Sequence, residues 1–327
     1  MRNMRNFIYG TIGGVRKRLS FSLVWHGILS RDRKIIKMTG SGNCETRVYF
    51  YPSVLHYLSN VRSLFPRKKY DYLIAQNFLH HEFLSCRKPK VFFTLEPPPA
   101  MTAETIKNMQ SERMKPFLYR YDEADAERRM FYPCFADHKE RILRDLGRML
   151  TEKRPRLCCI INRYSENPGL KLLAQRMLFV KAMGNAIDIY GAEPWGVPNK
   201  WREFPNYYGM TDDKRRTLRN YNFVIAFENS DYDGYITEKI IDAFASGTVP
   251  LYWGGGALLP DTIPSDCYID CRNKEPEKIY QMIKHMTQEE IVSFRRAALE
   301  FLASDAADRF TGRYLKLEIV KRLQGMG

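Results

Sequence analysis

Short apolar runs in the first part of the chain alternate with segments of helical periodicity. Residues 47–51 (RVYFY), 71–75 (DYLIA) and 90–95 (KVFFTL) have the length and composition of strands. Helices are expected at 55–65, 102–110 and 137–150, with a possible strand at 116–121. Strands that alternate with helices predict parallel βαβ units and therefore an α/β fold.

The polar segment at residues 151–156 (TEKRPR) interrupts this pattern with charges and a proline, which favours a linker. The alternation then begins again. Strands are expected at 157–162, 187–190, 223–227, 249–253 and 267–270, and helices at 170–183, 212–220, 276–286 and 287–302. We therefore expect two successive α/β domains.

The full expected organisation has four parts. Residues 1–40 form a basic N-terminal arm, 41–150 an N-terminal α/β domain, and 151–304 a C-terminal α/β domain. Residues 305–327 form a basic amphipathic helix, in which Leu315, Ile319 and Leu323 recur every fourth residue.

Residues 221–256 contain the most informative pattern. A strand at 223–227 is followed by a polar loop, and a helix then begins near Glu238 and ends before Gly247, a residue suited to a helix C-cap. In open α/β sheets, ligands bind at the carboxyl ends of such strands. Lys239 lies in the first helical turn, which costs about 0.3–1 kcal/mol unless an anion binds there. A solvated lysine on an ordinary helix is the simpler alternative.

The same stretch closely resembles the signature of the α1,3/α1,4-fucosyltransferase family. The matching residues are Tyr221, Phe223, Phe227-Glu228-Asn229-Ser230, Tyr235-Ile236-Thr237-Glu238-Lys239, Asp242-Ala243, Val249-Pro250 and Tyr252-Trp253-Gly254. The resemblance implies a GT-B fold with two facing Rossmann-like domains, in which residues 41–150 would bind the acceptor and residues 151–304 would bind the donor substrate, GDP-fucose. It implies no tightly bound cofactor.

The resemblance also implies which residues bind the donor. They are Asn162, Arg176, Glu228, Asn229, Tyr235, Thr237, Glu238 and Lys239. Arg176 and Lys239 would hold the diphosphate, for which the planar fork of arginine is well suited, and Glu238 would bind the ribose hydroxyls. Because the loop after Asn162 is longer than in the family pattern, Arg176 could instead be an ordinary exposed helix residue.

Glu96 is the implied catalytic base. It follows the strand-like segment VFFTL, in the position of the family pattern V-F-[YF]-T-x-E, and it precedes three prolines that the pattern lacks. Its expected role is to remove a proton from the attacking sugar hydroxyl. A surface or helix-capping glutamate is the alternative.

Asp231 and Asp233 form an Asp-x-Asp triplet, a pattern with which many other glycosyltransferases bind Mn²⁺ or Mg²⁺. Two aspartates in an ordinary turn are the simpler explanation, and the family's clamp is built from protein groups. We therefore expect no bound metal, although added Mn²⁺ or Mg²⁺ could stimulate the enzyme.

Charge and composition bear on location. Residues 1–40 contain nine Lys/Arg and the single acid Asp32, which gives them +8 of the net charge of +15. Such an arm suits peripheral contact with an anionic membrane, or is merely a solvated basic edge. No nucleic-acid-binding motif accompanies it.

The seven cysteines lack the spacing of a zinc site, and the sequence shows neither a signal peptide nor an apolar span. We therefore expect a cytoplasmic protein that is peripheral on the inner membrane face.

The sequence thus predicts an inverting glycosyltransferase that moves L-fucose from GDP-fucose to an oligosaccharide acceptor. The expected target is O3 of GlcNAc or glucose in an N-acetyllactosamine- or lactose-type glycan, and the pattern does not decide between α1,3 and α1,4 linkage. Three alternatives stay open: a related transferase with another nucleotide sugar, a non-catalytic glycan- or membrane-binding protein of the same fold, and a nucleic-acid binder.

Overall fold

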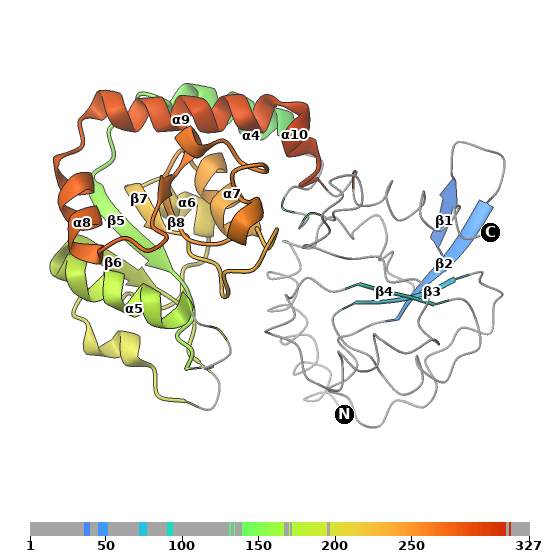
Figure 1. Cartoon of the computed structure of the whole chain (residues 1–327), viewed down its shortest axis with the longest axis horizontal. Coiled ribbons are helices and arrows are strands. Elements are labelled where there is room, and N and C mark those ends of the chain that lie inside the picture. The colour runs from blue at the N-terminus through green and yellow to red at the C-terminus, as the bar shows by residue number, and fades with distance from the viewer. Residues whose placement is uncertain are drawn as a thin grey trace, which may run out of the picture. The chain divides into compact units, whose positions relative to one another are not determined.

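The computed structural model describes two parts of the chain at different depth. It gives the backbone of residues 36–39, 45–51, 72–76 and 90–93, and the backbone and side chains of residues 131, 134, 139–166, 170, 172–194, 197–311 and 314. The chain forms two compact units (Figure 1). The first unit is Met1–Asp137 with Arg309–Gly327, and the second unit is His138–Asp308.

The first unit contains a four-stranded sheet in the order β1-β2-β3-β4. The strands are β1 (Ile36–Thr39), β2 (Glu45–Tyr51), β3 (Tyr72–Gln76) and β4 (Lys90–Phe93). Three of them occur where strands were predicted and pair in parallel, as βαβ units require. β1 was missed, because the basic composition assigned residues 36–39 to the arm; it pairs antiparallel with β2.

Several predicted parts of the first unit lie outside the described residues. They are the basic arm up to residue 35, the helices at 55–65 and 102–110, the strand at 116–121, Glu96, and the terminal helix around Leu315 to Leu323.

The second unit is built on a five-stranded, wholly parallel sheet in the order β6-β5-β7-β8-β9. Its strands are β5 (Arg156–Ile161), β6 (Ile187–Tyr190), β7 (Tyr221–Ile225), β8 (Val249–Tyr252) and β9 (Ile269–Asp270). Its described α-helices are α4 (Lys139–Met149), α5 (Leu172–Met183), α6 (Lys214–Leu218), α7 (Glu238–Ala245), α8 (Pro276–His285), α9 (Gln288–Ala303) and α10 (Asp305–Asp308). The second predicted α/β domain is therefore present as a parallel sheet with connecting helices.

Alternation along the strands produces the core. Cys158, Ile160, Phe223 and Ile225 share one face of the sheet and are almost wholly buried, together with apolar residues of α5 and α8. Phe179 of α5 packs edge-on against Phe227 just beyond β7, with 4.8 Å between ring centroids. Because helices cover both faces of a parallel sheet, its strands are mostly apolar, as in β5 (RLCCII) and β8 (VPLY).

The second unit begins one helix earlier than the linker at 151–156 suggested. Helix α4 packs against α9, and the buried Arg295 of α9 donates to the carbonyls of Leu150 (3.1 Å) and Glu152 (2.7 Å). These bonds fasten the expected linker to the unit instead of leaving it as a free connection.

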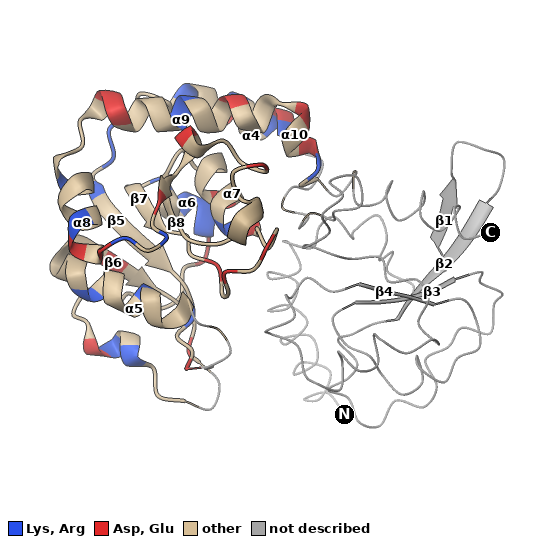
Figure 2. Cartoon of the chain, viewed as in Figure 1, with Lys and Arg blue, Asp and Glu red and all other residues tan. Residues whose placement is uncertain are grey.

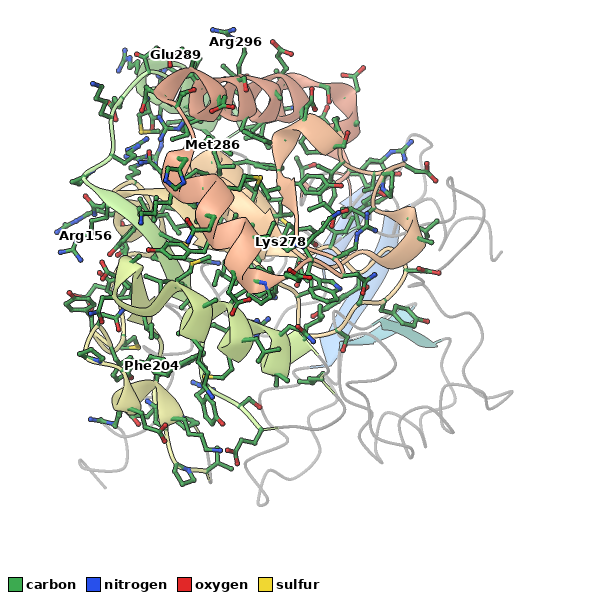
Figure 3. The ribbon with its side chains drawn as sticks, turned by 60° about the vertical axis from the view of Figure 1, so that its left-hand side comes forward. Arg156, Phe204, Lys278, Met286, Glu289 and Arg296 are labelled. Atoms are coloured by element: carbon green, nitrogen blue, oxygen red, sulfur yellow. The ribbon has the colours of Figure 1, made fainter. Side chains whose placement is uncertain are left out.

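Helix α9 has one buried face and one exposed face. Thr287 and Glu290 form a capping box at its start, in which each side chain accepts a hydrogen bond from the backbone N–H group of the other residue. Glu289 and Arg296 project away from the unit, whereas Ile291 and Ala298 are buried (Figure 3). Acidic and basic residues are interspersed along α9 (Figure 2). Among the helices that the structure describes, none is long and apolar enough to cross a bilayer.

Candidate functional site

The candidate site lies at the carboxyl ends of β5 and β7, which are adjacent parallel strands. Asn162 directly follows β5, and the loop from Phe227 to Gly234 follows β7. Glu238 begins α7, so the positive end of that helix dipole is presented by the same loop–helix segment. The sheet topology therefore gathers residues that are 76 positions apart (162 and 238) in the sequence.

Arg176 of α5 is the connector between the two strand ends. Its guanidinium donates to Asn162 Oδ1 (2.8 Å), to the Phe227 carbonyl (2.5 Å) and to Asn229 Oδ1 (3.1 Å). The side chain is 2% exposed, so the expectation of an ordinary exposed helix residue is wrong. Burial lowers the pKa of Arg176 to about 10, which still leaves it charged at neutral pH.

Glu228 is a second buried centre, with no exposed surface at all. Its Oε1 accepts hydrogen bonds from the Thr237 amide (2.8 Å), the Thr237 hydroxyl (2.9 Å) and the Tyr252 hydroxyl (3.1 Å). Its Oε2 accepts from the Lys239 ammonium at 2.7 Å and from the Thr237 hydroxyl at 2.8 Å. A buried carboxylate is tolerated only with such partners, and here they come from the start of α7 and from β8.

Gly254 makes room for this arrangement. A Cβ atom at residue 254 would lie 2.4 Å from Glu228 Cγ and 3.0 Å from the Tyr252 hydroxyl, much closer than van der Waals contact. The glycine therefore permits close approach of the turn after β8 to the Glu228 side chain.

Lys239 and Glu238 form the partly exposed part of the helix start. The Lys239 side chain is 16% exposed, and its ammonium also donates to the Thr237 hydroxyl at 3.0 Å. Burial opposes ionisation of Glu238, but the charges of Lys239 and Lys214 outweigh it and lower the pKa of its carboxyl. Glu238 is therefore ionised at neutral pH and able to accept hydrogen bonds from hydroxyl groups.

Asp231 and Asp233 bind backbone and indole N–H groups. Asp231 accepts from the Gly256 amide (2.9 Å) and from Trp253 Nε1 (3.1 Å), and Asp233 accepts from the Ala257 amide (2.7 Å). They thus fasten the loop after β7 to the turn after β8. No group of three or more metal-ligating side chains occurs within the described residues. Both carboxylates therefore have hydrogen-bond donors in the segment that follows β8.

The predicted donor-site residues separate into two sets by exposure. Asn162, Asn229, Glu238 and Lys239 are partly exposed, whereas Arg176, Glu228, Tyr235 and Thr237 are buried. All eight belong to the second unit, and side-chain hydrogen bonds join two groups among them: Arg176 with Asn162 and Asn229, and Glu228 with Thr237 and Lys239. The first set can touch a ligand, and the second supports the first.

Two supporting residues were not predicted. Tyr252 donates to Glu228, and Asp242 of α7, which is wholly buried, pairs with Lys214 Nζ (3.0 Å) and Arg215 Nε (3.2 Å) of α6. An acid among the apolar residues IIDAFA was a usable signal for Asp242, because an unpaired charge is not buried in a helix face.

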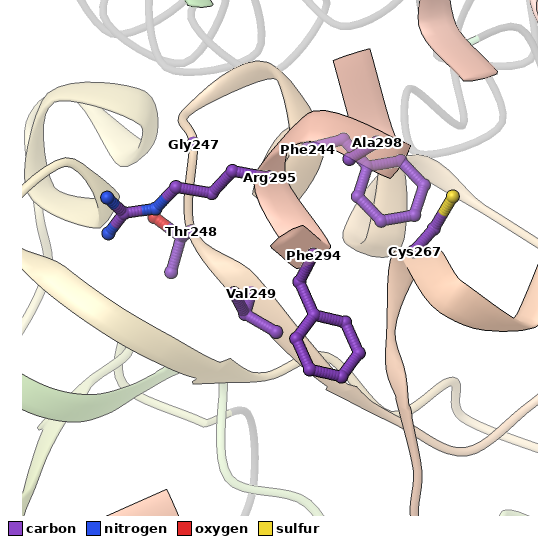
Figure 4. Close-up of a pocket in the computed structure, with 8 residues that line it drawn as sticks. All are labelled: Phe244, Gly247, Thr248, Val249, Cys267, Phe294, Arg295 and Ala298. Atoms are coloured by element: carbon purple, nitrogen blue, oxygen red, sulfur yellow. The ribbon is translucent and has the colours of Figure 1, made fainter. Parts of the chain in front are cut away.

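A separate small crevice lies at the other end of β8. Phe244, Cys267, Phe294, Arg295 and Ala298 line it together with the turn from Gly247 to Val249 (Figure 4). Its residues come from α7, α9 and the segments between them, and none of the predicted donor-site residues belongs to it.

Comparison with known proteins agrees with this geometry. Residues 151–295 match the family model described as glycosyltransferase family 10 (fucosyltransferase) C-term. A Helicobacter pylori α-(1,3)-fucosyltransferase is 31% identical over 125 residues, which cover 35% of this chain and 24% of that protein. A zebrafish (Danio rerio) GDP-fucose protein O-fucosyltransferase 3 is 35% identical over 77 residues, covering 23% and 16%. The chain thus spans less than a quarter of these relatives, and the predicted family resemblance is confirmed for this domain.

A solved structure supports the fold at low identity. The Anabaena Alr3699/HepE structure in complex with UDP and glucose has a TM-score of 0.50 and 12% identity, and it covers 78% of both chains. This likeness concerns the fold alone. Together with the parallel sheet of the second unit, it confirms the predicted α/β fold of GT-B type.

Proposed function

We propose, on the basis of the glycosyltransferase family 10 domain at residues 151–295, that the chain is a fucosyltransferase that uses GDP-fucose. The observation that supports this most is the Lys239 ammonium, held at the start of α7 beside the carboxyl edge of a parallel sheet. An ammonium and a helix N-terminus together attract the diphosphate of a nucleotide sugar.

The remaining partly exposed residues suit the rest of the donor. Glu238 is ionised and would accept hydrogen bonds from the two ribose hydroxyls. Asn162 and Asn229, both held by Arg176, would present their amides to the sugar and phosphate oxygens. Arg176 adds positive charge beneath them, which stabilises negative charge on the leaving group.

We propose an inverting, single-displacement transfer. The acceptor hydroxyl attacks the anomeric carbon of fucose while the bond from that carbon to the β-phosphate oxygen breaks. The electron pair leaves with GDP, where the positive groups of the site stabilise it, and the hydroxyl proton passes to a general base. The resemblance assigns that base to Glu96.

The acceptor proposed is an N-acetyllactosamine- or lactose-type glycan, fucosylated at O3 of GlcNAc or glucose. A protein hydroxyl is a second candidate, because one relative is described as a GDP-fucose protein O-fucosyltransferase. The relevant assay offers both acceptor classes in parallel, with a related nucleotide sugar such as GDP-mannose as the alternative donor.

We also propose that the chain acts in the cytoplasm, peripheral to the inner membrane face through its basic N-terminal segment. Nine Lys/Arg against one acid in residues 1–40 support an attraction to anionic lipid. Co-sedimentation with phosphatidylserine vesicles, compared with neutral phosphatidylcholine vesicles, tests this. Equal binding to both, or binding that survives deletion of residues 1–35, would contradict it.

The decisive experiment measures GDP release from GDP-fucose in EDTA, with and without each acceptor. Acceptor-stimulated release in EDTA supports a fucosyltransferase whose clamp is made of protein groups. Release only after Mn²⁺ is restored would instead favour Asp231 and Asp233 as metal ligands. Failure to bind GDP at all would contradict the donor assignment.

A further inference from the structure

The Lys239 ammonium is held by a carboxylate that a ligand cannot reach. Glu228 Oε2 lies 2.7 Å from Lys239 Nζ, yet Glu228 has no exposed surface, whereas the Lys239 side chain is 16% exposed. A donor bound at the start of α7 would therefore touch Lys239 and not Glu228. The resemblance had grouped both as donor-binding residues.

Glu228 is itself fixed from several directions. The Thr237 amide, the Thr237 hydroxyl and the Tyr252 hydroxyl all donate to it. Gly254 packs so closely against the Glu228 side chain that a Cβ atom at residue 254 would overlap it. A carboxylate held by this many bonds has one orientation. The ammonium that it binds therefore takes a fixed position as well, because a charge-assisted hydrogen bond is short and directional.

We propose that Glu228 is a positioning residue, which orients the Lys239 ammonium for the leaving diphosphate without contacting the donor. This inference rests on the proposed function of the site. A pre-oriented cation matters most when charge develops on the leaving group, since it then stabilises the transition state without reorganising. A flexible ammonium still binds GDP in the ground state.

The test variant is Glu228→Gln, which keeps the size of the side chain. Its amide oxygen can still accept from Thr237, but its NH₂ group would face the Lys239 ammonium as a second donor. We expect kcat to fall roughly ten- to hundred-fold, because one charge-assisted hydrogen bond to the catalytic cation is lost. The Kd for GDP should stay within about threefold of that of the unmodified chain. Removal of the negative charge beside Lys239 favours the anion, and this offsets the less fixed position of the ammonium.

Two matched variants identify Lys239 as the intermediary. In a Lys239→Ala background, Glu228→Gln should lower kcat no further, because the group through which it acts is gone. Tyr252→Phe removes a hydrogen bond from Oε1, away from Lys239, and should lower kcat much less than Glu228→Gln does. The proposal would be overturned if Glu228→Gln lowered kcat as much in the Lys239→Ala background as it does alone. It would also be overturned if Tyr252→Phe lowered kcat as much as Glu228→Gln.

Folding of each variant is checked by its thermal midpoint, with Glu228→Asp as a second probe should Glu228→Gln prove unstable. Aspartate keeps the charge but withdraws it by one methylene, so kcat should fall while GDP binding persists. A parallel loss of kcat and GDP affinity would mean direct ligand contact or collapse of the site, and would refute positioning. Absence of GDP binding by the unmodified chain would instead refute the proposed function.

Discussion

Lys239 is a partly exposed cation of the proposed donor site, and its truncation tests the proposal that it binds the diphosphate. Lys239→Ala should lower kcat by about 10²–10³, a loss comparable to removing one stabilising donor from an oxyanion hole. GDP affinity should fall roughly ten- to hundred-fold, as expected for a lost hydrogen bond between charged groups. Calorimetry with GDP and an acceptor-dependent turnover assay measure the two effects.

Lys239→Arg is the matched control, since it keeps the charge but changes the shape of the donor group. Its GDP affinity should lie closer to that of the unmodified chain than the alanine variant's does. Full activity of the Lys239→Ala variant would show that Lys239 does not bind the diphosphate.

Gly254 carries a steric prediction. In Gly254→Ala, the new Cβ would lie 2.4 Å from Glu228 Cγ, so the carboxylate has to leave its partners. Such overpacking costs about 1–3 kcal/mol of unfolding free energy. We expect a lower denaturant midpoint together with reduced turnover.

Gly147→Ala provides the comparison, because nothing lies within 4 Å of a Cβ there and α4 favours alanine at a helical position. That variant should be neutral or stabilised by about 0.5–1 kcal/mol. Equal behaviour of the two alanine variants would contradict the close contact between residues 254 and 228.

Glu238 makes the stability of the second unit depend on acid pH. Its pKa is lowered in the folded state: burial opposes ionisation, and the charges of Lys239 and Lys214 outweigh it. Its contribution is therefore fully present above the unfolded pKa of about 4.3 and is lost as pH falls through the lower folded pKa. Near pH 6 the Glu238→Gln variant should have a lower unfolding free energy than the unmodified chain. This difference should shrink toward pH 3. A difference independent of pH would contradict the assignment.

Among the elements, α7 shows what sequence patterns can and cannot provide. The apolar spacing and Gly247 predicted its position, and Gly247 indeed has a φ of 64° after the C-cap residue Ser246. The strand before it was predicted two residues too late. β7 begins at Tyr221, which pairs with Arg156, whereas Ala226 and Phe227 extend the apolar run beyond the ladder.

Side-chain burial was harder to predict than element type. An arginine within the apolar segment LLAQRMLFV is equally consistent with an exposed position on α5 and with a buried guanidinium. Which occurs depends on acceptors from elsewhere in the chain: Asn162, Phe227 and Asn229. The family motif predicted which residues belong to the site, but it did not predict their separation into a partly exposed set and a buried set.

For the whole molecule, the second unit contains its own sheet, its own core and all the predicted donor-site residues. Compact units of this size commonly fold alone. A fragment of residues 138–308 should therefore fold cooperatively and bind GDP, with an affinity within about tenfold of the full chain's. It should not transfer fucose, since the base assigned to Glu96 is absent from it.

The comparison needs circular dichroism, GDP titration and a turnover assay on the fragment and the full chain. A Lys239→Ala version of the fragment is the control for specific binding. GDP binding by the full chain but not by the folded fragment would mean that the first unit contributes to the donor site. Transfer by the fragment would exclude Glu96 as the essential base.

The division of the proposed donor site into a partly exposed and a buried set also has a practical consequence for enzyme engineering. Attempts to change the accepted nucleotide sugar should randomise Asn162, Asn229 and their exposed neighbours. Arg176, Glu228 and Thr237 are better left unchanged, because each is held by several internal hydrogen bonds on which its neighbours depend. A small library confined to the partly exposed positions would thus keep most of its members folded while it samples new donors.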